Sequence, residues 1–265
     1  MGYENNALGL WVNGDTLVTA EQLSGRNFLI AKYGTYFHKN VQAAYDVKIP
    51  CLLFYEGNPE LLFESGYNNA EWDDAINVDL QNILEAIGSR VVHGVVIDCK
   101  VKDSLEKLIE ANWVAGYTKR LLTRSNEILG IPSFHYMAPG VPGMYSGNDK
   151  EIINQFIIGC KTISTWSATT SIDGFPADGT KPALPYDDST LCPWAFWLFA
   201  ANSGKFDVLY NGDVAALYAK LKYITATSTE TTVETPTDTT GIAAAINRLA
   251  AAEEAKLVWL KSKFG

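Results

Sequence analysis

The stretch Val91-Val-His-Gly-Val-Val-Ile-Asp98 is a nearly continuous apolar run that ends in a carboxylate. Strands of a parallel sheet have this pattern, because helices cover both of their faces. A long segment with apolar residues at helical spacing follows, at residues 104–129. A buried strand followed by a helix is the repeating unit of parallel α/β folds, so this stretch predicts the fold class.

The same alternation extends on both sides of this stretch, over about the first 220 residues. Helices are expected at residues 38–47, 70–87, 104–129 and 149–158. Strands are expected at residues 7–12, 27–33, 49–55, 91–98, 133–137, 162–166, 194–199 and 206–210. A doubly wound open sheet is the rival topology, but no glycine-rich phosphate loop follows the first strand. The sequence therefore predicts an α/β protein with a (β/α)8 TIM-like barrel.

The composition is that of an ordinary globular chain: 265 residues, 47% hydrophobic and 19% charged. The net charge of −9 disfavours binding to a phosphate backbone, so no nucleic-acid partner is expected. No apolar run is long enough for a membrane span, and residues 1–6 do not resemble a signal peptide, so the protein is expected to be made in the cytoplasm. Scattered histidines and cysteines predict no metal site, and no cofactor is expected.

The composition changes sharply at Thr225. Residues 225–240 contain nine threonines and three acids, which predicts an extended linker. A helix with apolar residues at a 4-3-4-3 spacing is expected after it. The predicted organisation is a lysozyme-like barrel at residues 1–224, a linker at 225–240 and a docking helix at 241–265. This helix either packs on the barrel, docks on another protein or self-associates.

Functional side chains of a (β/α) barrel lie at the carboxyl ends of its strands. The carboxylates expected there are Asp98, Glu56 and Asp213. The aromatic residues expected there are Trp11, Tyr33, Tyr55, Tyr136, Trp166 and Trp197. Aromatic rings stack on sugar rings and carboxylates bind hydroxyls, so this end of the barrel is predicted to bind a glycan. The alternative is that the aromatic residues only fill the barrel.

Several motifs resemble, in their order and spacing, the family 25 glycoside hydrolases, which are phage and bacterial muramidases. The motifs are Gly9-Leu-Trp-Val-Asn13, Phe28-Leu-Ile-Ala-Lys-Tyr-Gly34, Val95-Val-Ile-Asp98-Cys-Lys100, Trp194-Ala-Phe-Trp197 and Asn211-Gly-Asp213. The resemblance covers roughly residues 7–221. It implies a (β/α) barrel, a peptidoglycan substrate and an association with bacteriophages.

The departures from this family concern its catalytic residues. The resemblance places Lys100 where the family has the Glu of its Asp-x-Glu strand, and Trp11 where it has the Asp of its first strand. Glycosidases need a carboxylic acid that protonates the leaving oxygen. A lysine two residues after Asp98 is expected to lower the pKa of Asp98, the wrong direction for this role. Of the family's carboxylates, the resemblance retains Asp98 and Asp213, and Glu56 is the best relocated partner for Asp98.

Three functions follow from these residues. The first is a catalytically inactive barrel that serves as a bacteriophage virion-associated structural or cell-wall-glycan-binding protein, incorporated in the particle through residues 241–265. The second is an active peptidoglycan-degrading muramidase that uses a relocated carboxylate pair. The third is an assembly component without a ligand. The loss of the family's acid makes the first function the leading hypothesis.

Overall fold

The computed structural model describes residues 3–59, 69–138, 140–159, 165–168, 174–177, 180, 182 and 194–224. The predicted linker at 225–240 and docking helix at 241–265 lie outside the described residues. The side chain of Trp166 lies outside them as well.

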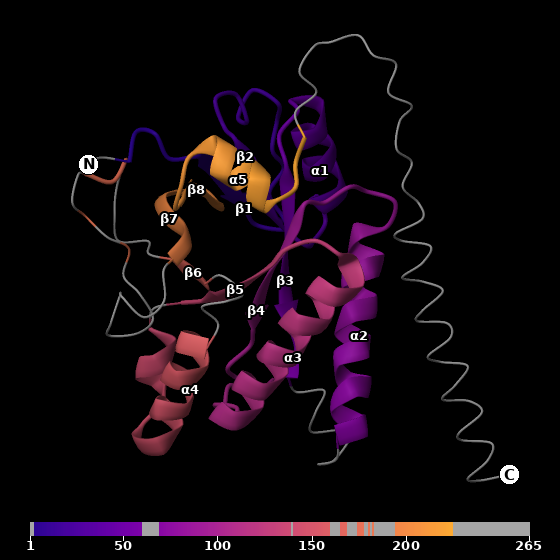
Figure 1. Cartoon of the computed structure of the whole chain (residues 1–265), viewed down its shortest axis with the longest axis vertical. Coiled ribbons are helices and arrows are strands. Elements are labelled where there is room, and N and C mark those ends of the chain that lie inside the picture. Colours follow the sequence, from indigo (N-terminus) through magenta and orange to yellow (C-terminus); the bar gives the residue numbers. More distant parts are fainter. Residues whose placement is uncertain are drawn as a thin grey trace, which may run out of the picture.

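The protein is a mixed α/β structure whose strands form a curled sheet (Figure 1). Strands β1 to β7 pair in parallel in chain order, and β8 pairs antiparallel with both β7 and β1, which closes the ring. The strands are β1 Leu8–Val12, β2 Phe28–Lys32, β3 Cys51–Gly57, β4 Gly94–Cys99, β5 Ser133–Met137, β6 Thr165–Ala168, β7 Trp194–Asn202 and β8 Lys205–Tyr210.

Four of the described helices connect successive strands between β2 and β6, as the sequence predicts. They are α1 Phe37–Asp46, α2 Asn69–Ile87, α3 Ala111–Leu129 and α4 Gly147–Gly159, the last preceded by the short 3₁₀ helix η2 Val141–Met144. In Figure 1, α2 and α3 lie side by side over one face of the sheet. A fifth helix, α5 Val214–Lys220, follows β8.

The described residues do not form the complete (β/α)8 repeat that is predicted from the sequence. Residues 13–27, between β1 and β2, form turns and no α-helix. The connection from β7 to β8 is a tight turn at Ser203 and Gly204, which have φ angles of 46° and 79°. Because a parallel crossover needs a dozen or more residues, a turn this short makes β8 antiparallel.

The helix predicted at residues 104–129 begins later than expected, at Ala111. The Asp103 carboxylate accepts hydrogen bonds from the backbone N–H groups of Leu105 (2.9 Å) and Lys107 (2.8 Å). Such bonds from an Asp side chain offer the backbone an alternative to a helix. The residues before α3 therefore form a loop.

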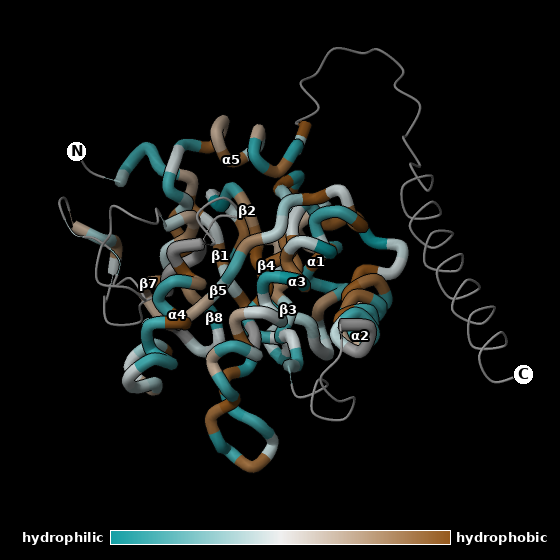
Figure 2. Tube along the Cα trace, turned by 60° about the horizontal axis from the view of Figure 1, so that its bottom comes forward, coloured by the Kyte–Doolittle hydropathy of each residue, from teal (hydrophilic) through white to brown (hydrophobic). Residues whose placement is uncertain are grey.

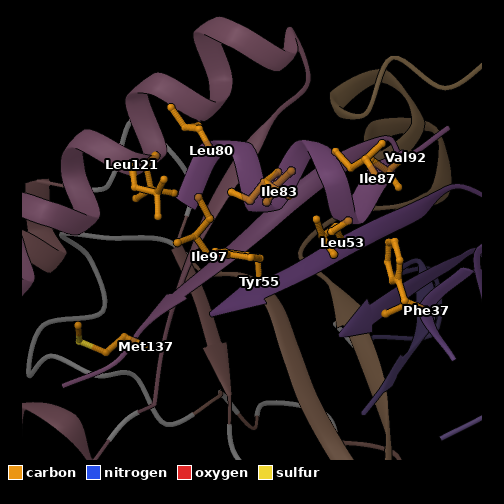
Figure 3. Close-up of a cluster of buried hydrophobic side chains, with 14 of the residues drawn as sticks. Phe37, Leu53, Tyr55, Leu80, Ile83, Ile87, Val92, Ile97, Leu121 and Met137 are labelled. Atoms are coloured by element: carbon orange, nitrogen blue, oxygen red, sulfur yellow. The ribbon is translucent and has the colours of Figure 1, made fainter. Parts of the chain in front are cut away.

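Two apolar layers hold the sheet together. On its outer face, Leu53 and Ile97 lie among buried residues of α2 and α3, such as Ile83 and Leu121 (Figure 3). The interior layer consists of side chains one position away along each strand: Phe28, Ile30, Leu52, Phe54, Val96, Phe134, Phe196, Leu198 and Val208. Both faces are thus apolar, which explains why β2 and β4 are mostly brown in Figure 2.

Helix α5 lies at the end of the ring where the parallel strands begin. Leu217 and Leu221 are buried in the same cluster as Ala7 and Phe28. The Tyr218 hydroxyl donates to the carbonyl oxygen of Asn27 (3.3 Å), just before β2. This end of the ring is covered by α5. Functional side chains of parallel α/β sheets lie at the opposite end, where the parallel strands finish.

Candidate functional site

Two carboxylates lie next to each other where β3 and β4 end. Glu56 and Asp98 are register partners on these adjacent strands. Side chains two residues apart on a strand share a face, so both continue the interior rows of Phe54 and Val96. Neighbouring strands are about 4.8 Å apart, which puts the two carboxyl groups within range of strong mutual repulsion.

Lys32, the last residue of β2, completes this group. Its ammonium donates to Glu56 Oε1 at 2.8 Å, and the two side chains are 27% and 43% exposed. Lys32 follows Ile30 by two residues, so it belongs to the interior row of its strand. The ammonium therefore compensates the charge of Glu56 at the open end of the ring. We call Lys32, Glu56 and Asp98 the carboxylate triad.

The pKa of Asp98 is raised from its usual range to about 8. Burial is the main cause, the negative charge of Glu56 adds to it, and Lys32 opposes it. This direction is opposite to the lowering expected from Lys100. Lys100 is exposed and lies beyond the end of β4, where its backbone N–H donates to the carbonyl oxygen of Gly57 (3.2 Å). A shift in this direction favours the protonated form of Asp98, the form that a general acid needs.

Four aromatic rings form a continuous row beside the triad. Phe206 contacts Trp11, with ring centroids 5.3 Å apart, and Trp11 contacts Phe54 at 5.8 Å. Phe54 in turn contacts Tyr136 at 5.3 Å. Tyr136 is the register partner of Asp98, and burial together with the Asp98 charge raises the pKa of its phenol. We call these four residues the aromatic row.

A pocket of about 480 Å³ opens against Asp98 and Tyr136. The loop that carries Lys100 and Glu106 forms one wall, and the segment from Met137 to Val141 forms the other. This mouth pocket is large enough for one or two sugar rings, which fits ligand sites of several hundred Å³.

The structure places three of the other predicted glycan-binding residues away from this mouth. Tyr55 is buried on the outer face, where its hydroxyl donates to Asp79 Oδ1 (2.8 Å). Trp197 is fully buried and packs with Tyr3 and Phe199 rather than with the interior layer. Tyr33 is 48% exposed and its ring contacts Phe37 of α1.

Asp213 lies at the other end of the protein. Because β8 runs antiparallel to β1, its last residues return to the end where the parallel strands begin. There the Asp213 carboxylate accepts from the backbone N–H of Ala216 (2.8 Å) and caps α5. The structure does not bring Asp213 to Asp98 and Glu56.

Sequence reasoning did not identify Lys32, Phe54 and Phe206 as site residues. Lys32 does carry a signal, because it is a charged residue at the end of an apolar strand. Phe54 and Phe206 lie in apolar runs whose inward face no pattern reveals. Within the described ranges, no three His, Cys, Asp or Glu side chains are grouped so that they could hold a metal ion. Over the same part of the chain, no helix is both long and apolar enough to cross a membrane.

Comparison of sequences gives no relatives: no known family and no curated protein matches the chain. Solved structures do match its fold. The catalytic domain of endolysin ply40, from bacteriophage P40 of Listeria monocytogenes, has a TM-score of 0.52 and 13% identity, covering 84% of this chain and 100% of that domain. The spore cortex lytic enzyme SleM of Clostridium perfringens has a TM-score of 0.56 and 11% identity, covering 80% and 69%.

A third match, the glycosyl hydrolase 25 GHIP of Streptococcus pneumoniae, has a TM-score of 0.49 and 10% identity over 81% of this chain and 92% of that one. The first two matches show that this chain shares its fold with domains of two lytic enzymes. The fold likeness to an endolysin domain and to a spore cortex lytic enzyme is consistent with the lysozyme-like fold that the sequence motifs predict. Identities this low establish the fold and not the activity.

Proposed function

We propose that the protein binds cell-wall glycan at the mouth pocket and serves as a lysozyme-like component of a bacteriophage particle, without the catalytic acid that the family resemblance implies. The observation that carries this proposal is the mouth pocket itself, where the Tyr136 ring lies next to the Asp98 carboxyl and other polar side chains. Aromatic faces stack on the C–H surfaces of sugars, and polar groups beside them fix the orientation of the ring.

Two further points support a binding role. Lys100 occupies the position that the resemblance assigns to the family's catalytic Glu, and it is exposed beside the pocket. The ply40 match is a bacteriophage protein, which agrees with a place in a phage particle. Attachment to that particle is assigned to the linker at 225–240 and the helix at 241–265.

Sedimentation with purified peptidoglycan tests the binding role. Tyr136→Leu removes the aromatic ring that lines the mouth pocket while keeping an apolar side chain, and we expect it to weaken binding about tenfold or more, roughly the loss of one stacking contact. Tyr33→Leu is the matched control, because Tyr33 is an aromatic residue outside the mouth, and it should bind like wild type. Equal loss in both variants, or no binding by wild type, overturns the proposal and favours an assembly component without a ligand.

A second candidate is hydrolysis of the glycan by Glu56 and Asp98. The observation that favours it is the pKa of Asp98, raised to about 8, beside a second carboxyl, Glu56, that Lys32 contacts. Retaining glycosidases hold two carboxyl groups close together, and register pairing on adjacent strands makes Glu56 the candidate partner of Asp98.

In this mechanism Asp98 donates its proton to the glycosidic oxygen as the bond to the anomeric carbon breaks. The Glu56 carboxylate attacks that carbon and forms a glycosyl ester. Water then attacks the same carbon, Asp98 takes the proton from this water, and Glu56 leaves as the carboxylate. The product keeps the anomeric configuration of the substrate.

Release of reducing ends from peptidoglycan separates the two candidates. If the protein is a hydrolase, Asp98→Asn and Glu56→Gln abolish release, whereas Asp213→Asn at the far end leaves it intact. If wild type releases reducing ends and Asp98→Asn does not, the protein is a hydrolase and the first proposal, in which catalysis is lost, is wrong. Binding without any release by wild type contradicts the hydrolytic candidate.

A further inference from the structure

We propose that Lys32 is a positioning residue of the carboxylate triad: its ammonium holds Glu56 as the carboxylate, so that the one proton of the pair stays on Asp98. This inference rests on the hydrolytic candidate for its use in catalysis. The placement of the proton can be measured whether or not the protein is a hydrolase.

The pair needs a third group to decide which carboxyl is protonated. Two carboxyl groups this close do not both ionise readily near neutral pH, and the proton they share belongs to the pair rather than to either residue. Register pairing does not distinguish Glu56 from Asp98, since each is the last but one residue of its strand and faces the interior. Chemistry that needs one acid and one carboxylate requires this symmetry to be broken.

Lys32 breaks the symmetry because it contacts one member of the pair. Its Nζ lies 2.8 Å from Glu56 Oε1, and the ion pairs of the described residues join it to Glu56 and not to Asp98. A carboxylate bonded to an ammonium is stabilised in its charged form. The ammonium is therefore placed to select Glu56 as the ionised partner.

The surroundings of the two carboxyl groups favour the same assignment. Glu56 is 43% exposed, so water solvates its charge. Asp98 is more buried, between Glu56 on one adjacent strand and Tyr136 on the other. Burial disfavours a charge at Asp98, while Lys32 and water favour one at Glu56. Both effects give Asp98 the acid role and Glu56 the carboxylate role.

The experiment is a pH titration of ¹³C-labelled Asp and Glu carboxyl groups by NMR, from pH 5 to 10. In wild type we expect the Asp98 resonance to shift with a midpoint near 8 while Glu56 stays ionised throughout. In Lys32→Met the Glu56 and Asp98 resonances should shift together, and the last step should move upward by about one pH unit. Lys32→Arg, which keeps the charge, should restore the wild-type pattern.

Lys119→Met is the matched control, because it removes an exposed positive charge of α3 and should titrate like wild type. Circular dichroism checks that each variant is folded, and Lys32→Arg supplies a readout if Lys32→Met is not. A Glu56 resonance that shifts with Asp98 in wild type, or a Lys32→Met titration equal to wild type, overturns the inference.

The outcomes for the inference and for hydrolysis are separable. Wild type that releases no reducing ends but titrates as expected contradicts the hydrolytic candidate alone. An active enzyme whose pH profile is unchanged in Lys32→Met contradicts the inference alone. If both hold, Lys32→Met shifts the pH profile of kcat/KM and Lys32→Arg restores it.

Discussion

Asp98 couples the stability of the whole protein to pH. Its pKa is about 8 in the folded protein against 3.8 for a free side chain, so the folded state holds a proton that the unfolded state has already lost. The free energy of unfolding therefore falls as pH rises from about 4 to about 8. Asn resembles the protonated carboxyl, so we expect Asp98→Asn to match wild type near pH 4 and to exceed it by about 1–3 kcal/mol at pH 9.

Urea denaturation at intervals between pH 4 and pH 9 measures this difference. Asp46→Asn, an exposed change at the end of α1, should stay parallel to wild type over the whole range. If the Asp98→Asn and wild-type curves are also parallel, Asp98 is ionised in the folded protein and the acid role assigned to it is wrong.

The sequence identified Asp98 and Glu56 correctly as strand-end residues but misjudged the side chains next to them. In strands that alternate apolar and polar residues, the pattern shows which face is buried. In Phe54-Tyr55-Glu56, both faces of the strand are covered, so nothing in the sequence indicates that Phe54 faces inward and Tyr55 outward. The same ambiguity applies to Trp197. Because side chains alternate along a strand, a difference of one position decides whether a side chain faces the interior or the outside of the ring.

At the scale of elements, Asp79 of α2 fixes the end of β3. Its carboxylate is buried and accepts hydrogen bonds from the hydroxyls of Tyr55 and Tyr117 and from the backbone N–H of Asn58, each at 2.8 Å. Tyr55 and Asn58 flank Glu56, so this carboxylate holds the backbone that presents Glu56 to Asp98.

Asp79→Ala should lower the free energy of unfolding by about 2–4 kcal/mol, because it removes a buried carboxylate that accepts hydrogen bonds from two hydroxyls and a backbone N–H. Chemical denaturation measures the loss. Asp73→Ala is the matched control on the same helix, since its carboxylate is exposed and 3.9 Å from Arg120, and we expect less than about 0.5 kcal/mol. A similar small loss for Asp79→Ala would show that its hydrogen bonds do not hold the strand end.

Helices and strands could be predicted where the local pattern of apolar residues and the length of the segment determine them. They were predicted wrongly where a turn or loop determines the direction or the start of an element. Strands β1 to β5 follow the apolar runs of the sequence. The direction of β8 depends instead on the turn at Ser203 and Gly204, and the start of α3 depends on Asp103. Turn chemistry of this kind is a signal in the sequence, but apolar periodicity does not contain it.

At the scale of the whole molecule, α5 and the described residues after it pack against the closed ring. The last described turn packs back on the structure, because the ring of Tyr223 contacts both Tyr218 of α5 and His93 ahead of β4. Leu217 and Leu221 bury their side chains at the end of the ring. The proposed division into a barrel at 1–224 and an attachment segment at 225–265 therefore makes a prediction about truncation.

A chain that stops at residue 224 should fold with an unfolding free energy close to that of the full chain and should keep its binding to peptidoglycan. It should lose incorporation into particles or self-association, measured by co-purification and by analytical ultracentrifugation. A chain that stops at residue 212 is the control: it lacks α5 and exposes the interior layer, so it should lose several kcal/mol or fail to fold. If the chain that stops at residue 224 is unstable as well, residues 225–265 belong to the barrel and do not form a separate attachment segment.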